Sequence, residues 1–278
     1  MQCQTIMTEW RTGRSKPYRA LCPKIALSGT CQMKTVIEQF KQRAETYSGS
    51  ANWIADFTLL QTHLEACGRP PGHVLEMCCG TGMVGRKFQA AGWHVCGIDL
   101  TRKMAEEANQ YFPCICAPVE DIPFLDNAFD VVVLRQAYFL LEDGQKALAQ
   151  ARRVLKSDGV LVFSQTVPYS EQDAVWLEKV HRAKQAQLRN FYTEETLACE
   201  LEREYFRVVE IRRLSVRENI THWMNAAPEL SESKKTEVCS LIVNAPEIYR
   251  SIHQVEVMDG EIFENWHWVI FTARKKQT

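Results

Sequence analysis

The segment VLEMCCGTGMVG, residues 74–85, joins a short apolar run to a glycine-rich turn and to the start of a helix. The run is apolar apart from Glu76, which is typical of a strand buried inside a sheet. Three glycines in the turn allow the backbone to approach a ligand closely, and a helix that begins there presents free N–H groups to that ligand. The segment therefore predicts a strand, a turn and a helix that together hold a small molecule.

Apolar runs and amphipathic helical patterns alternate along the rest of the chain. After residue 85, apolar runs lie at 93–98, 114–117, 129–134, 160–165, 206–214 and 266–273, the last rich in aromatic residues. Strands that are apolar throughout and separated by amphipathic helices are typical of a parallel sheet covered on both faces. The predicted fold class is therefore a doubly wound α/β domain.

The alternation changes near the end of the chain. About fifty residues, 215–264, separate the last two predicted strands, and a structureless connection of that length is unusual in a compact domain. We expect a helical substrate cap at 215–264, inserted between the last two strands over the carboxyl edge of the sheet. Residues 33–214 and 265–278 would form the main domain, and residues 1–32, which show little periodicity, a poorly ordered extension.

Composition and charge exclude several classes of protein. The chain has 33 lysines and arginines against 34 aspartates and glutamates, and 46% of its residues are apolar. A protein that binds a nucleic-acid duplex through its phosphates normally has a basic surplus, which this chain lacks. No apolar run approaches the roughly 18–20 residues needed to span a bilayer. We expect a globular protein that acts neither on nucleic acid nor in a membrane.

Cysteine is frequent, with eleven residues scattered along the sequence and two adjacent at Cys78 and Cys79. A disulfide-rich secreted module would be shorter and would follow a signal peptide, and the first thirty residues contain no continuous apolar segment. No CxxC or HxxxH spacing, as expected of a metal site, occurs. We expect reduced thiols, a cytoplasmic location and no metal.

Glu76 distinguishes between two ligands that a glycine-rich turn can hold. The spacing Gly80-x-Gly82-x-x-Gly85 also fits the fingerprint of dinucleotide-binding proteins. A carboxylate at the end of a buried strand would repel a pyrophosphate, and burying it is costly unless a cation or a hydrogen-bond donor meets it. A ligand with an ammonium or sulfonium group and no phosphate would meet that need.

Two further segments add polar groups at the same edge of the predicted sheet. Asp99 closes the next apolar run, in GIDLTRKM (97–104), where a carboxylate can bind a ribose diol or cap the following helix. In VEDIPFLDNAFD (119–130), Val119 and Glu120 are placed to border an adenine. Arg135 and Gln136 follow the next strand, where the reactive end of the ligand should point.

Together with ARRVLKSDGVLVF (151–163), these segments resemble the class I S-adenosylmethionine-dependent methyltransferases. Within that class the sequence is most similar to the small-molecule branch that includes the ubiquinone and menaquinone C-methyltransferases. The resemblance covers about residues 35–214 and the last strand. It implies a Rossmann-like, mostly parallel sheet of seven strands with an antiparallel last strand. It also implies S-adenosyl-L-methionine as cofactor, a small-molecule or metabolite acceptor, and a monomer or homodimer.

The resemblance also implies roles for individual residues. Glu76 matches the acid near the methionine end of the cofactor, Gly80 and Gly82 match the glycines beneath it, and Asp99, with Leu100 beside it, matches the ribose ligand. Cys78 stands where the family usually has its first glycine, and Pro118 where many members place an aspartate on the adenine amino group. In the first helices, Tyr47 is a candidate to close over the cofactor.

Methyl transfer from a sulfonium needs alignment and desolvation, and an alcohol or phenol acceptor also needs a base. The candidates for catalysis are His222, in NITHWMN, then His253 and Tyr138. His222 and Tyr138 also have a structural interpretation, His222 as a surface residue and Tyr138 as a core residue. Two other functions remain open: an NAD(P)-dependent oxidoreductase that uses Gly80, Gly82 and Gly85, and a catalytically silent cofactor-binding partner subunit.

Overall fold

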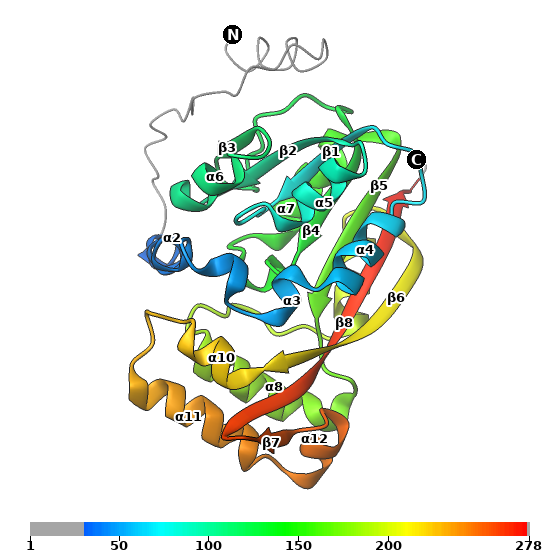
Figure 1. Ribbon diagram of the computed structural model, residues 1–278. Coiled ribbons are helices and arrows are strands. Elements are labelled where there is room, and N and C mark those ends of the chain that lie inside the picture. Colours follow the sequence, from blue (N-terminus) through cyan, green and yellow to red (C-terminus); the bar gives the residue numbers. More distant parts are fainter. Residues whose placement is uncertain (1–30, 277–278) are drawn as a thin grey trace.

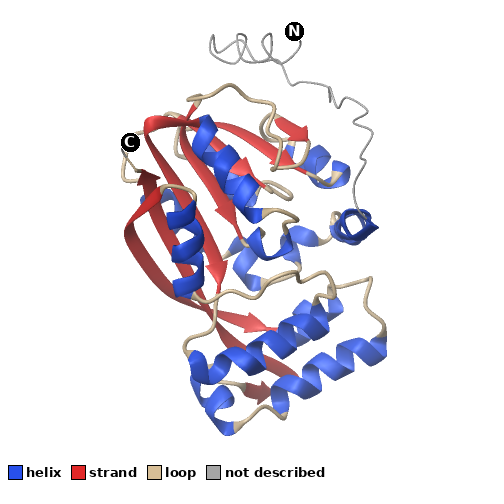
Figure 2. Ribbon diagram, turned by 180° about the vertical axis from the view of Figure 1, so that it is seen from behind, coloured by secondary structure: helices blue, strands red, loops and turns tan. Residues whose placement is uncertain are grey.

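The computed structural model describes residues 31–276. Within them, strands form one sheet in the order β3-β2-β1-β4-β5-β8-β6, and the short β7 pairs with β8 (Figures 1 and 2). The strands are β1 (His73–Met77), β2 (His94–Asp99), β3 (Cys114–Cys116), β4 (Phe129–Arg135), β5 (Leu155–Thr166), β6 (Phe206–Asn219), β7 (Glu256–Met258) and β8 (Glu261–Lys275). Strands β1 to β5 are parallel, and β8 is antiparallel to both β5 and β6. The predicted fold class is confirmed.

Helices cover both faces of this sheet. They are α2 (Cys31–Arg43), α3 (Asn52–Ala55), α4 (Phe57–Glu65), α5 (Met83–Ala90), α6 (Arg102–Ala108), α7 (Gly144–Val154), α8 (Glu171–Lys184), α9 (Glu194–Arg203), α10 (Ile220–Asn225), α11 (Glu232–Val243) and α12 (Glu247–Ile252). Two 3₁₀ helices, η1 (Tyr47–Gly49) and η2 (Tyr138–Leu140), lie in the loops. In the described residues, no helix combines the length and apolarity needed to cross a membrane.

Alternate residues of the central strands pack into two separate cores. Val132 and Leu134 of β4 face a core with α7 and α9, whereas Val131 and Val133 face one with α4 and α5. Successive side chains of a strand point to opposite faces, so a strand that is apolar at every position supplies both cores. This is why the sequence of β4 contains no polar residue between Asp130 and Arg135.

Strands β6 and β8 are longer than their apolar runs predicted. They stay paired as far as Asn219 and Phe263, and this ribbon extends beyond the parallel strands into a second group of elements. That group contains α8, α10, α11, α12 and β7 (Figure 1). Helix α8 packs against α11 and α12, although it precedes β6 in the chain. The extension of β6 over residues 215–219 was missed because the sequence SVREN contains no continuous apolar run, although Val216 and Glu218 are buried.

The predicted domain limits correspond only in part to these elements. Helices α10 to α12 and β7 fall within the predicted cap, 215–264, but so do the paired ends of β6 and β8. Most of the extension predicted at 1–32 lies outside the described residues, and α2 begins at Cys31. The carboxyl ends of β1, β2 and β4 lie side by side in the sheet, which brings Met77, Asp99 and Arg135 to one edge.

Candidate active site

A pocket lies at the carboxyl ends of β1, β2 and β4, next to α2 and η1, and we call it the glycine-turn pocket. Most residues predicted to bind a cofactor line it: Tyr47, Cys78, Gly80, Asp99, Leu100, Val119, Glu120, Arg135 and Gln136. Glu76 lines a smaller adjoining pocket that also contains Tyr47 and Arg135. Gly82 lies in neither pocket.

The turn after β1 requires an unusual backbone at three positions. Cys78, Gly80 and Gly82 have φ of 52°, 54° and 81°, in the left-handed region that only glycine adopts without cost. A Cβ at Gly82 would lie 2.7 Å from the Phe112 ring, so Gly82 packs the turn against the protein and does not face the pocket. Cys78 holds its conformation under steric strain, at a position where the family usually has glycine.

Asp99 fixes this turn from the end of β2. One carboxylate oxygen accepts from the backbone N–H of Gly80 at 2.9 Å, and the other accepts from the N–H of Thr101 at 2.8 Å, at the start of α6. Burial raises the pKa of Asp99 to about 6, against these donors. A carboxylate oxygen can accept more than one hydrogen bond, so Asp99 combines both predicted roles: it holds the backbone and lines the pocket.

Glu76 is buried at the end of β1 and contacts the start of α5. Its carboxylate accepts from the N–H of Gly85 at 2.7 Å. The sequence argument that this carboxylate needs a cationic ligand was therefore too narrow, because the chain itself supplies a donor. Burial still raises the pKa of Glu76 to about 8, so its charge is poorly compensated by the protein alone.

Arg135 is buried between two indole rings at the end of β4. Its guanidinium carbon lies 4.8 Å from the ring centre of Trp53 and 5.6 Å from that of Trp268. The guanidinium donates to the carbonyls of Trp53 and Ile54, which anchors α3 to the sheet edge. Burial lowers the pKa of Arg135 to about 10. Its Nε is buried and has no hydrogen-bond partner within residues 31–276.

A second pocket adjoins the first, and we call it the α8 pocket. The two share Phe40, Tyr47 and Gln136. Its walls are largely aromatic, with Trp53, Phe139, Trp223 and Trp266, and its polar residues include Arg43, His181, Lys184 and Gln185. The Gln136 amide is held at the junction by two hydrogen bonds with Thr166, of 2.7 and 2.8 Å.

His181 and Lys184 of this pocket were missed by the sequence analysis. They lie one turn apart on α8, near the buried residues Leu177 and Val180. Burial lowers the pKa of His181 to about 4 and that of Lys184 to about 7. A lysine within the apolar stripe of an amphipathic helix was the available signal, because such stripes normally face the core.

Two of the predicted catalytic residues lie outside both pockets. His222 is exposed on α10, and its Nε2 lies 2.5 Å from the carbonyl oxygen of Gly49 in η1. Tyr138 is buried in the core, where its hydroxyl donates to Glu200 at 2.8 Å. The sequence placed each near the sheet edge, but the direction of a side chain depends on packing that the sequence does not reveal.

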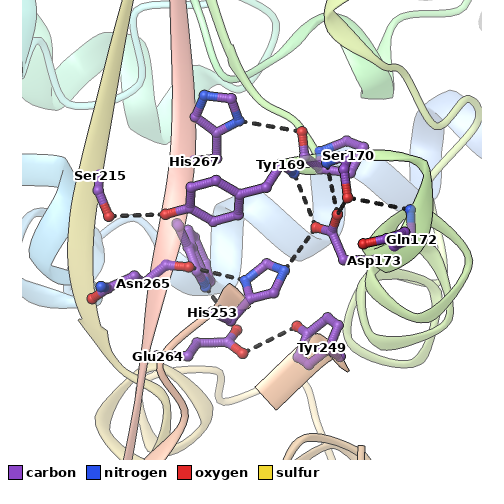
Figure 3. A network of polar contacts seen from close by, with 12 residues as sticks. Tyr169, Ser170, Gln172, Asp173, Ser215, Tyr249, His253, Glu264, Asn265 and His267 are labelled. Carbon is purple, nitrogen blue, oxygen red and sulfur yellow. Dashed lines mark hydrogen bonds and ion pairs between the residues drawn. The ribbon is translucent and has the colours of Figure 1, made fainter. Parts of the chain in front are cut away.

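His253, the remaining candidate, belongs to a buried polar network instead of a pocket (Figure 3). Its two ring nitrogens lie 2.9 Å from a carboxylate oxygen of Asp173 and 3.0 Å from the carbonyl oxygen of Asn265. Asp173 also accepts from the N–H groups of Tyr169 and Ser170. The hydrogen bond from His253, followed by these two N–H groups, lowers the pKa of Asp173 despite burial. With both nitrogens engaged and 1% exposed, His253 joins α8 to β8 and has no free position for a substrate proton.

No group of three His, Cys, Asp or Glu side chains that could hold a metal ion occurs in the part of the chain that the structure describes. The eight cysteines between residues 67 and 239 are all free thiols, and the sulfurs of Cys79 and Cys114 lie 3.3 Å apart.

Residues 75–163 match the family model described as a methyltransferase domain. An uncharacterized methyltransferase of Bacillus thuringiensis is 31% identical over 159 residues, which cover 54% of this chain and 70% of the relative. The demethylmenaquinone methyltransferase of Thermotoga maritima is 32% identical over 103 residues, 35% of this chain and 45% of that protein. A solved structure described as a methyltransferase of Bacillus halodurans has a TM-score of 0.71 at 21% identity, and covers 79% of this chain and 100% of its own.

Proposed function

The chain belongs to the class I S-adenosylmethionine-dependent methyltransferases, and from this premise we propose that it methylates a small-molecule acceptor held in the α8 pocket. The observation that carries the proposal is the junction of the two pockets at Phe40, Tyr47 and Gln136. In-line transfer requires the acceptor atom to face the sulfonium, so the two ligands must occupy adjoining spaces. The α8 pocket adjoins the glycine-turn pocket at these three residues.

The residues of the glycine-turn pocket fit S-adenosylmethionine. Asp99 would accept from the ribose hydroxyls, and Leu100, Val119 and Glu120 would surround the adenine. Glu76 would take the ammonium group, which matches a carboxylate whose charge the protein compensates poorly. The unpartnered Nε of Arg135 is a donor for the methionine carboxylate.

When bound, S-adenosylmethionine supplies a methyl group that is already activated on a sulfonium, so the chain mainly aligns and desolvates the acceptor. Tyr47 lies over the glycine turn, where its ring would be 3.3 Å from a Cβ at Gly80. It also contacts Phe40 and Trp53, edge to face, and these three rings line the α8 pocket. The side-chain amide of Gln136 is held in one orientation by Thr166 at the point where the two pockets meet.

For an acceptor that must lose a proton, we propose His181 as the base. Its low pKa keeps the imidazole neutral at pH 7, and its ring lines the α8 pocket. His181→Ala should lower the formation of S-adenosylhomocysteine with a proton-losing acceptor by about 10- to 100-fold and leave cofactor affinity unchanged. His222→Ala, outside both pockets, is the control and should change neither quantity.

A thermal-shift comparison tests the assignment of the first pocket. S-adenosylhomocysteine at 100 times its Kd should stabilise the protein by about 2.7 kcal/mol, while NADH and NADPH should not change the melting temperature. Stabilisation by a nicotinamide dinucleotide, with S-adenosylhomocysteine inert, would favour the oxidoreductase. Binding of S-adenosylhomocysteine without turnover across a broad acceptor panel would favour the silent partner subunit. The comparisons support neither alternative.

We also propose a domain organisation, a cellular location and an oligomeric state for the protein. Residues 33–214 and 265–278 would form the cofactor domain and residues 215–264 the substrate cap, to which α8 contributes from outside. This is supported by the lining of the α8 pocket, which takes Trp223 from α10, Ala226 directly after it, and His181 and Lys184 from α8. A cytoplasmic location is supported by the free thiols. Light scattering during gel filtration should give the mass of one or two chains.

A further inference from the structure

Lys184 is a buried cation without a counterion. It is 3% exposed, at the last residue of α8, and its ammonium lies 4.7 Å from the centre of the Trp223 ring. Within the described chain the ammonium has no hydrogen bond and no ion pair with a carboxylate. Burying an unpaired charge is costly, so such a residue is unusual unless a ligand pairs with it.

The neighbouring carboxylate of Glu229 forms its ion pair with Arg43 and not with Lys184, and its second oxygen is buried without a hydrogen-bond partner in the described residues. One oxygen of Glu229 accepts from Arg43 Nε at 2.9 Å and from the Gln39 amide at 3.2 Å. On the far side, Lys235 pairs with Glu232. Arg43 and Glu229 therefore neutralise each other, and Lys184 leaves one uncompensated positive charge in the wall of the α8 pocket.

The other residues that line the α8 pocket fit a flat apolar ligand. The indole rings of Trp53, Trp223 and Trp266 and the phenyl rings of Phe40 and Phe139 line the same pocket. Aromatic walls favour aromatic ligands through stacked and edge-to-face contacts. Building on the proposed function, we propose that the methyl acceptor is an aromatic carboxylate, bound through its carboxylate by Lys184 and through its ring by these indoles.

The proposal predicts how the affinity for the carboxylate depends on pH. Burial and the positive charges of Arg43 and Lys235 lower the pKa of Lys184 to about 7, while Glu229 acts in the opposite direction. A bound carboxylate stabilises the protonated lysine, so affinity is constant below pH 7. Above pH 7 it falls about tenfold per pH unit, because the lysine must first take up a proton. The pKa of His181 is about 4 and that of Tyr47 about 12, so neither titrates in this range. Glu76, with a pKa of about 8, does titrate there, but it lines the adjoining pocket and not the α8 pocket.

The test measures binding by calorimetry to the full chain saturated with S-adenosylhomocysteine. The probes are benzoate, salicylate, indole-3-carboxylate and 1-naphthoate, each paired with its primary amide. At pH 6.5 we expect at least one carboxylate to bind at least tenfold more tightly than its amide. For that carboxylate, Lys184→Met should remove the difference and Lys184→Arg should restore part of it. Lys179→Met is the matched control, because Lys179 lies on the exposed face of α8 with its ammonium 4.4 Å from the Trp176 ring.

Three results would overturn the proposal while S-adenosylhomocysteine still binds: equal affinity for carboxylate and amide, no binding by any carboxylate, or full carboxylate affinity in Lys184→Met. The pH profile of the unmodified protein gives an independent test if the variant does not fold, since a Kd that stays constant from pH 6 to 9 contradicts it as well. Failure to bind S-adenosylhomocysteine would instead remove the proposed function itself.

Discussion

The glycine-turn pocket and the α8 pocket adjoin each other but are built in different ways. Most of the first comes from short segments that directly follow parallel strands, so its residues appear in the sequence as compact motifs. The second takes side chains from α2, the loop before α3, α8, α10 and β8, which are far apart in the chain. The difference explains why the sequence motifs predicted most residues of the first pocket but missed His181 and Lys184 of the second.

The largest effect should come from Gly80→Val. A side chain at this left-handed position would meet the Tyr47 ring at 3.3 Å and fill the approach to the ligand. We expect the Kd for S-adenosylhomocysteine, measured by calorimetry, to rise by roughly 100-fold or more. Gly68→Val is the matched control, because Gly68 has a similar φ of 56° but open space around it. Retained affinity in Gly80→Val would place the ligand elsewhere.

Asp99→Ala should have the next largest effect on the same Kd. It removes the acceptors for the ribose hydroxyls and the two backbone hydrogen bonds that fix the turn. The expected loss is about 2–3 kcal/mol, or roughly 30- to 150-fold. Binding of the aromatic carboxylate probes should be unaffected by this change when no S-adenosylhomocysteine is present. Equal loss in both pockets would show that they are not independent.

Glu76→Gln should raise the stability of the protein at high pH but weaken its binding of S-adenosylhomocysteine. Because burial raises the pKa of Glu76 from 4.5 to about 8, the protonated form is favoured in the folded state. Stability from this group is therefore fully present below pH 4.5 and is lost as the pH rises toward 8. A neutral glutamine avoids that loss, so the variant should melt at a higher temperature at pH 8.5 and differ little at pH 4.5.

The same variant should bind S-adenosylhomocysteine about tenfold more weakly, because it lacks the charge that meets the ammonium group. Asp130→Asn is a control at the opposite end of the sheet, where Asp130 pairs with Arg69 and Lys156. It should lower stability and leave cofactor affinity unchanged. A Glu76→Gln variant that melts no higher at pH 8.5, or binds as well as the unmodified protein, would contradict the assignment.

Cys78→Gly should give the smallest effect, and in the favourable direction. Glycine accepts the φ of 52° without steric cost, so the turn should gain about 1 kcal/mol in stability and up to about fivefold in affinity. Asp259→Gly is the control, since Asp259 has the same φ in the turn between β7 and β8, far from either pocket. It should leave the Kd unchanged. Weaker binding in Cys78→Gly would mean that the thiol itself contacts the ligand.

The sequence predicted the fold and the first pocket because both depend on local patterns. Continuous apolar runs identify the buried strands, and the polar residues that end them, such as Asp99, meet at one edge of a parallel sheet. The paired end of β6 was not predictable in this way, because it has no apolar run. Its buried Glu218 instead accepts hydrogen bonds from the N–H groups of Asn52 and Trp53, which lie far away in the sequence.

The residues of the α8 pocket could not be predicted from local patterns either, for a different reason. His222 and His253 were chosen because they lie in the inserted segment, yet one contacts Gly49 at the surface and the other is fixed by Asp173. Lys184 and His181 lie in a helix outside that segment, and only the packing of α8 against α11 and α12 determines which of its faces meets the pocket. Long-range packing of this kind leaves little signal in a single sequence.

Strand β8 runs beside both pockets as one continuous stretch of backbone. Trp266 lines the α8 pocket, and Trp268, two residues later on the same face, packs against Trp53 and Arg135 beside the other pocket. Their Cα atoms are therefore separated by a fixed spacing of about 7 Å. If the two pockets hold donor and acceptor as proposed, β8 sets the distance between them. Inserting one residue between the two indoles should then misalign the reactants even if each pocket still binds its ligand.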